Sequence, residues 1–147
     1  RKQVRPLMQI KIDTNVKDVA RRIGKKGKEL SDSVKYALSR TALKGKDIIQ
    51  DRMTAGKAIK GGNFKKYDSV YAAFRSSKGR GTKPDLQFTG QMFSAITTKS
   101  NSKQAEIFFS RAQEAKKAAM NNKSRPFFGF SRSEERMLGN VFFRALK

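Results

Sequence analysis

Residues 92–109 read MFSAITTKSNSKQAEIFF. Two strand-like runs, 92–98 and 104–109, flank a polar stretch at 99–103. Apolar runs on either side of a short polar turn are typical of a β-hairpin. Near the start of the chain, Met8, Ile10 and Ile12 alternate with polar residues, which is the period of a half-buried strand. We therefore predict a small antiparallel sheet with a central hairpin, to which the strand over 8–12 can add.

A long amphipathic helix is predicted after this first strand. Asp13, Thr14 and Asn15 are all good N-cap residues, and apolar residues then recur at helical steps as far as Met53. Because glycine weakens a helix interior, we expect this helix to break near Gly24, Gly27 or Gly45, with Gly45 as the favoured position.

A second helix is predicted at the other end of the chain. Residues 131–134 read SRSE, which is a capping box, and an apolar face follows from Met137 to Leu146. Between the hairpin and this helix, Arg111–Met120 is rich in alanine and predicts a short helix that stops at the asparagine pair 121–122.

These elements predict an α+β fold, with a long N-terminal helix, a small antiparallel β-sheet and a C-terminal helix packed on the sheet. The length of 147 residues fits one domain over 1–147. Within it, 1–60 hold the strand and long helix, 61–85 a basic loop region with a short helix at 67–74, and 86–147 the hairpin and last helix. The residues expected to share one core are Ile96, Ile107, Phe127, Phe128, Val141 and Phe142.

The composition argues against catalysis. The chain contains no histidine and no cysteine, so it lacks the commonest general base, metal ligand and thiolate nucleophile. Its 12 carboxylates are scattered among 34 lysines and arginines, which disfavours an acidic metal cluster. Gly79 and Gly81 do not connect a strand to a helix as a nucleotide-binding loop requires. We expect no enzyme activity, no metal and no cofactor.

The net charge of +22 predicts a polyanionic partner, either nucleic acid or an acidic protein surface. The charge is spread over the whole chain, unlike that of a basic tail; a merely solvated basic surface is the alternative. A loop over 76–84, with three interruptions by glycine or proline, is predicted to be flexible. The candidate contacts are Lys25, Lys26 and Lys28 on the helix and Lys78, Arg80 and Lys83 on the loop.

Two short segments are predicted to form structural corners. Thr89 and Gly90 precede the hairpin, where glycine permits a sharp turn and the threonine hydroxyl can bond to it. The second segment, Arg125–Gly129, reads RPFFG. Its arginine is held extended before Pro126, so that its guanidinium can bridge carbonyls or a carboxylate while Phe127 and Phe128 anchor the last helix.

The order of these segments resembles the virion-morphogenesis or tail-completion family of tailed bacteriophages. Residues 86–96 read LQFTGQMFSAI, and are followed by the hairpin, by RPFFG at 125–129 and by a last helix. The resemblance covers 67–147, whereas the first 60 residues are similar only in being helical.

This resemblance implies a structural virion protein of the neck, which joins the head connector to the tail. It implies a homo-oligomeric ring, expected to be a hexamer, whose neighbours are a portal-side connector protein and a tail tube or tail terminator protein. Genomic DNA would pass through the lumen. We expect the protein in the virion and, during assembly, in the host cytoplasm, with no membrane association, because no apolar run approaches a spanning length and no signal peptide is apparent. The alternative is a basic nucleic-acid-binding protein of ribosomal or nucleoid type.

Overall fold

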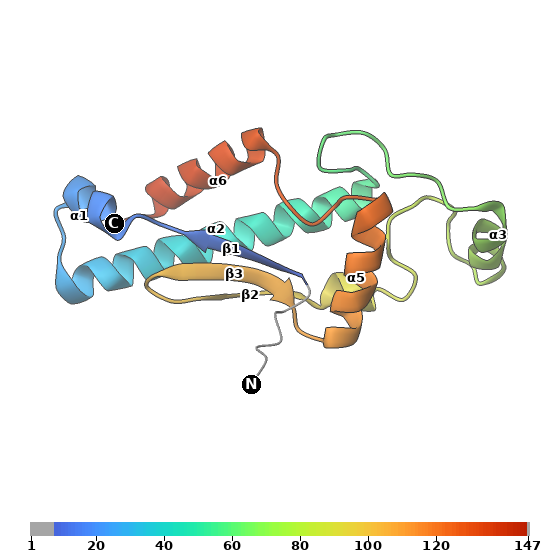
Figure 1. Cartoon of the computed structure of the whole chain (residues 1–147), viewed down its shortest axis with the longest axis horizontal. Coiled ribbons are helices and arrows are strands. Elements are labelled where there is room, and N and C mark those ends of the chain that lie inside the picture. Colours follow the sequence, from blue (N-terminus) through green and yellow to red (C-terminus); the bar gives the residue numbers. More distant parts are fainter. Residues whose placement is uncertain (1–7, 147) are drawn as a thin grey trace. The chain divides into compact units, whose positions relative to one another are not determined.

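The computed structural model describes residues 8–146 and has an α+β fold, as predicted (Figure 1). The chain folds into two compact units, each assembled from separate segments. We call the first the sheet unit, which comprises 9–48, 97–108 and 130–146. We call the second the loop unit, which comprises Met8, 49–96 and 109–129. The residues expected to share one core are divided between them, because Ile107, Val141 and Phe142 belong to the sheet unit and Ile96, Phe127 and Phe128 to the loop unit.

The sheet has three strands in the order β1-β3-β2. Strand β1 (Gln9–Asp13) pairs antiparallel with β3 (Gln104–Phe109), and β2 (Ile96–Ser100) forms the hairpin with β3. The Asn101 side-chain oxygen accepts hydrogen bonds from the backbone N–H groups of Lys103 and Gln104, at 2.7 and 2.9 Å, which closes the polar turn. The predicted strand over 92–98 is only partly right, because Gln91–Ser94 forms a single helical turn, α4.

The predicted long helix breaks at Gly24, one of the three candidate glycines, and not at the favoured Gly45. Helix α1 (Val16–Ile23) begins at the predicted N-cap Asn15 and ends at Gly24, whose φ of 65° lies in the left-handed region. Helix α2 (Gly27–Ala55) then continues through Gly45 without a break. A Cβ on Gly45 would lie 2.8 Å from Ile107 Cδ1 and 2.9 Å from the Phe130 ring. Gly45 is therefore needed for close packing inside the sheet unit.

The C-terminal helix α6 (Arg132–Ala145) begins with the predicted capping box of Ser131 and Glu134. In the sheet unit it lies along β1 and α2, and residues of these three elements line one groove (Figure 1). Leu138 and Phe142 are its buried residues. The buried apolar residues of the sheet unit are Val19, Val34, Ala37, Leu38, Ala42, Ala105, Ile107, Leu138 and Phe142.

The loop unit contains the end of α2 and three further helices: α3 (Ser69–Ser77), α4 and α5 (Ala112–Ser124). Helix α4 lies against α5 (Figure 1). Helix α5 runs past the predicted stop at 121–122. The side chain of Asn122 is hydrogen-bonded to the turn that follows the helix. Its side-chain oxygen accepts from the backbone N–H groups of Phe127 and Phe128, both at 3.0 Å.

No helix within residues 8–146 combines the length and the apolar character that crossing a membrane requires.

Candidate functional site

Both predicted corners lie in the loop unit. Gly90 has a φ of 80° and is the N-cap of α4, while the Thr89 hydroxyl accepts a hydrogen bond from the Gln91 N–H at 3.3 Å. The predicted turn is confirmed, but it leads into α4 before the chain enters β2. The Thr89 hydroxyl therefore bonds to the local turn, as predicted.

Arg125 bridges carbonyl groups, as predicted. Its Nε donates to the Lys65 carbonyl at 2.7 Å and its Nη2 to the Lys66 carbonyl at 3.0 Å. Its guanidinium also lies 4.7 Å from the centre of the Tyr67 ring. Pro126 accepts from the Ile59 N–H through its carbonyl at 2.9 Å. Arg125 and Pro126 thus tie the loop over 57–67 to the end of α5.

A buried arginine that the motif reasoning missed holds the rest of this segment. Arg52 Nη1 donates to the carbonyls of Phe127 and Gly129, at 2.5 and 2.7 Å. Phe127 is fully buried, and the Phe128 ring packs on Phe109 at 5.2 Å. The sequence contains a signal for the burial of Arg52. It follows Ile49 by three positions and therefore lies on the same face of α2 as this buried residue.

A second buried arginine, Arg75, organises the basic loop over 76–84. Its Nε donates to the Gly81 carbonyl at 2.7 Å, and its Nη2 forms an ion pair with Asp85 at 3.2 Å. The Arg80 N–H in turn donates to the Arg75 carbonyl at 2.8 Å. The loop over 76–84, which was predicted to be flexible, is instead held from inside by Arg75.

An aromatic cluster surrounds Arg75. The rings of Tyr67 and Tyr71 meet edge to face at 4.9 Å, and those of Phe74 and Phe88 stack at 5.6 Å with planes 19° apart. The Arg75 guanidinium lies 5.0 Å from the centre of the Tyr67 ring. Burial raises the pKa of the Tyr67 hydroxyl, and the hydrogen bond from the Leu86 N–H and the charge of Arg75 lower this pKa in part. These rings border a cavity of about 470 Å³.

The six basic candidates are divided between the two units. Lys28 lies at the start of α2 in the sheet unit, whereas Lys25 and Lys26 lie in the link between α1 and α2 and not on a helix as predicted; the other three belong to the loop unit. Lys78 Nζ lies 5.8 Å from the Phe74 ring, and the Arg80 guanidinium lies 5.8 Å from the Phe88 ring. Lys78 and Arg80 therefore flank the stacked Phe74–Phe88 pair. Lys83 is exposed, and its side-chain carbons lie over Gly56.

Several acidic side chains form separate ion pairs with lysines or arginines. Glu106 lies 3.2 Å from Lys99 Nζ, and Glu114 lies 3.2 Å from Lys117 Nζ. Within residues 8–146 no group of three or more aspartates and glutamates could hold a metal ion. The loop unit places cations and aromatic rings side by side.

Comparisons with protein-family models, curated proteins and solved structures find no match to this chain.

Proposed function

We propose that this chain is a structural virion protein that joins the head connector of a tailed bacteriophage to its tail, as a ring component of the neck. The observation that carries the proposal is the order of LQFTGQMFSAI at 86–96, the hairpin, RPFFG at 125–129 and a final helix. In this account the protein works by binding and closure. It acts in the virion, and during assembly in the host cytoplasm.

The contacts made by the two motif segments suit such a role. Thr89–Gly90 and Arg125–Gly129 are occupied in holding backbone turns, through Gln91, Lys65 and Lys66. A segment whose side chains are engaged in this way supplies a rigid scaffold. Binding to neighbours is then left to exposed residues elsewhere on the chain.

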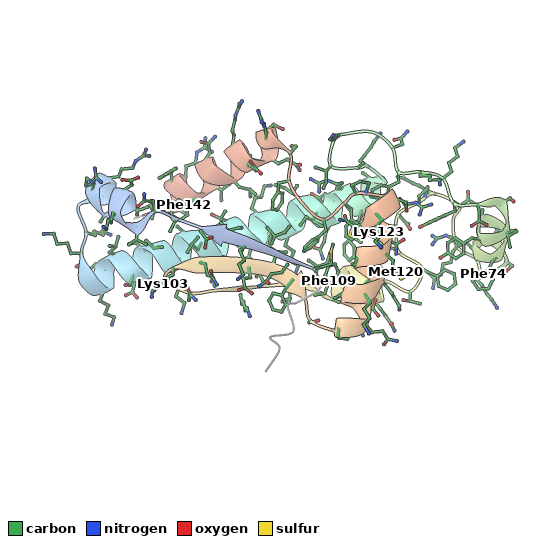
Figure 2. The ribbon with its side chains drawn as sticks, in the orientation of Figure 1. Phe74, Lys103, Phe109, Met120, Lys123 and Phe142 are labelled. Atoms are coloured by element: carbon green, nitrogen blue, oxygen red, sulfur yellow. The ribbon has the colours of Figure 1, made fainter. Side chains whose placement is uncertain are left out.

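Exposed apolar side chains support assembly into a ring. Leu43 on α2 and Met137 on α6 are exposed in the sheet unit, and Met120 on α5 is exposed in the loop unit (Figure 2). Large exposed apolar residues are candidates for contacts between subunits. We expect a hexamer, placed between a portal-side connector protein and a tail tube or tail terminator protein.

The exposed basic residues would let the proposed ring bind a second kind of partner, a polyanion. Lys26, Lys28, Lys78 and Arg80 are exposed, and a net charge of +22 favours polyanions. Genomic DNA in the lumen would be contacted through its phosphates, which carry no sequence information. Acidic faces of the neighbouring ring proteins compete for the same lysines.

Deletion of the gene from a phage that encodes this chain tests the proposal. Electron micrographs should show filled heads and complete tails that fail to join, because a closing ring is dispensable for building either half. Expression of the wild-type chain in trans is the control and should restore joined particles. If deletion instead stops head formation before DNA enters, the assignment to the neck is wrong.

The charge alone favours a second candidate, a basic nucleic-acid-binding protein of ribosomal or nucleoid type. This candidate predicts that the chain co-purifies with ribosomes or bulk DNA of uninfected cells. The neck proposal predicts instead that it co-purifies with virions. Immunodetection in the two fractions separates these outcomes.

A further inference from the structure

The cavity in the loop unit has an unusual lining. It is bordered by aromatic rings, among them Tyr67, Tyr71 and Phe88, and by charged side chains, of which two, Arg75 and Glu114, are buried. Both charged residues are only 2% exposed. A buried charge is costly unless its polar atoms are paired, so the partners of each atom are informative.

One atom of each charged side chain lacks a partner among residues 8–146. Arg75 uses Nε for the Gly81 carbonyl and Nη2 for Asp85, which leaves the buried donor Nη1. Glu114 uses Oε1 for Lys117, which leaves the buried acceptor Oε2. The lining therefore offers one hydrogen-bond donor and one acceptor beside a set of rings. A matching ligand carries both an acceptor and a donor on a flat body.

Cations outnumber carboxylates around the cavity, which favours an anionic ligand. The lining has Arg75, Lys117 and Arg125 against Asp68 and Glu114, and Lys78 and Arg80 flank the stacked Phe74–Phe88 pair. Phe74 projects from α3 and is 46% exposed, so one of these rings is accessible from solvent (Figure 2). Cations around an accessible aromatic ring are the elements with which proteins bind single-stranded nucleic acid.

We propose that this cavity binds an unpaired base of single-stranded nucleic acid. The base stacks on the rings and accepts from Arg75 Nη1, while one of its N–H groups donates to Glu114 Oε2. The cations at the rim contact the flanking phosphates. Every nucleobase presents an acceptor beside a donor, so this arrangement recognises an exposed base edge rather than a sequence. A base inside a duplex has both its faces and its edge occupied and is not a ligand.

This inference goes beyond the proposed role in the neck and does not depend on it. If the protein contacted phosphates alone, its affinity for single strands, duplexes and base-free strands would depend only on their charge. A base-binding cavity distinguishes them. The surface of the loop unit also favours nucleic acid over an acidic peptide, because a peptide needs no ring on which to stack.

The test uses the full chain and a fluorescent single-stranded DNA of about 12 nucleotides in about 150 mM salt, where weak surface attraction is partly screened. The comparison probes are an abasic strand of equal length, the duplex and the equivalent RNA. We expect the single strand to bind on the order of tenfold more tightly than the abasic strand, since the two differ only in their bases. The RNA arm shows whether the 2′-hydroxyl matters. Equal affinity for the normal and abasic strands would overturn the proposal.

Two variants locate the interaction. Phe74→Ala should weaken binding of the single strand on the order of tenfold. Val70→Ala is the matched control, because Val70 is a 79% exposed apolar residue of the same helix that does not line the cavity. It should change affinity less than about twofold. Equal effects of the two changes would contradict the proposal.

Glu114→Gln provides a test in which phosphate attraction and base binding predict opposite changes in affinity. It removes a negative charge from a chain of net charge +22, so pure phosphate attraction predicts tighter binding. Loss of a charged acceptor for a base N–H predicts binding severalfold weaker. Circular dichroism confirms that each variant is folded. A stronger complex, or an acidic peptide that binds with equal sensitivity to Phe74→Ala, would overturn the proposal.

Discussion

Both units bury an apolar core, but in the loop unit arginines also donate to backbone carbonyls and so hold its loops. In the sheet unit, Leu38, Ile107 and Phe142 are buried, and Gly45 lets two side chains approach α2 closely. In the loop unit, Arg52 and Arg75 are both at least 92% buried, and each fixes a loop. The number of arginines in the chain is therefore no direct measure of how many cations are exposed to bind a polyanion.

The difference follows from the secondary structure of each unit. Long helices and a sheet satisfy their own backbone groups, so their contacts can be apolar. Short helices joined by loops leave carbonyls such as those of Lys65, Gly81 and Phe127 to be satisfied by side chains. The planar guanidinium, with five N–H donors, can serve two carbonyls at once.

The largest expected effect is loss of apolar packing in the sheet unit. Phe142→Ala should lower the free energy of unfolding by about 3–5 kcal/mol, because it empties a buried site. The adjacent Phe143 is 46% exposed and provides the control, since Phe143→Ala should cost much less. Urea unfolding followed by circular dichroism measures both. Equal losses of unfolding free energy would show that Phe142 contributes no more to the core than the exposed Phe143.

The second expected effect concerns the loop unit. Arg52→Met should cost about 3 kcal/mol, because it keeps most of the side chain while leaving the carbonyls of Phe127 and Gly129 without this charged donor. Arg136→Met, on the exposed surface of α6, is the matched control and should be nearly neutral. The same urea experiment compares them. A neutral Arg52→Met would remove the distinction between the two units.

The third expected effect compares the two sets of basic candidates. Lys78→Gln, Arg80→Gln and Lys83→Gln together should cost less than about 1 kcal/mol of stability, since exposed cation–ring contacts are weak. If these residues contact phosphates, the salt dependence of duplex DNA binding should flatten by about 0.9 logarithmic units per lost contact. The control removes the same charge from the sheet unit through Lys25→Gln, Lys26→Gln and Lys28→Gln.

Each outcome of this comparison assigns a partner. If only the triple variant of Lys78, Arg80 and Lys83 flattens the salt dependence, DNA binds at 78–83. If only the triple variant of the sheet-unit lysines flattens it, DNA binds at 25–28. Failure of head–tail joining with unchanged DNA binding would point to an acidic neighbour. Unfolding of the loop-unit triple would mean that these cations belong to the scaffold formed by Arg75.

The smallest expected effect is a loss of stability at high pH. Burial raises the pKa of Tyr67 above its ordinary value of 10.0, so between the unfolded and folded pKa the folded state binds more protons. The stability that this proton contributes is present below pH 10 and falls as the pH rises through the folded pKa. Tyr67→Phe should weaken this decline relative to the wild type, as measured by urea unfolding between about pH 9 and 11. An unchanged decline would show that other groups cause it.

The features that could be predicted from the sequence are those determined by neighbouring residues. Asn15 and Ser131 cap their helices as predicted, and Gly90 adopts the left-handed turn. The alternation over 8–12 placed a strand correctly. Arg125 bridges carbonyls as expected, because Pro126 holds it extended.

The features that could not be predicted depend on contacts between distant segments. Gly45 resembled a break because its packing against Ile107 and Phe130 is not visible locally. The loop over 76–84 seemed free because an arginine is expected at the surface, yet Arg75 is buried and holds it. Likewise, the cavity between α3 and α5 requires Glu114 to lie near residues about 40 positions away in sequence.

The proposed role in the neck is tested most directly by restoring joining with purified protein. Filled heads and complete tails from a phage that lacks the gene are mixed, with or without the purified chain, and infectious particles are counted. The account predicts few particles without the chain and a rise that saturates as it is added. If joining proceeds equally well without it, or if the folded wild-type chain produces no rise, the central claim is contradicted.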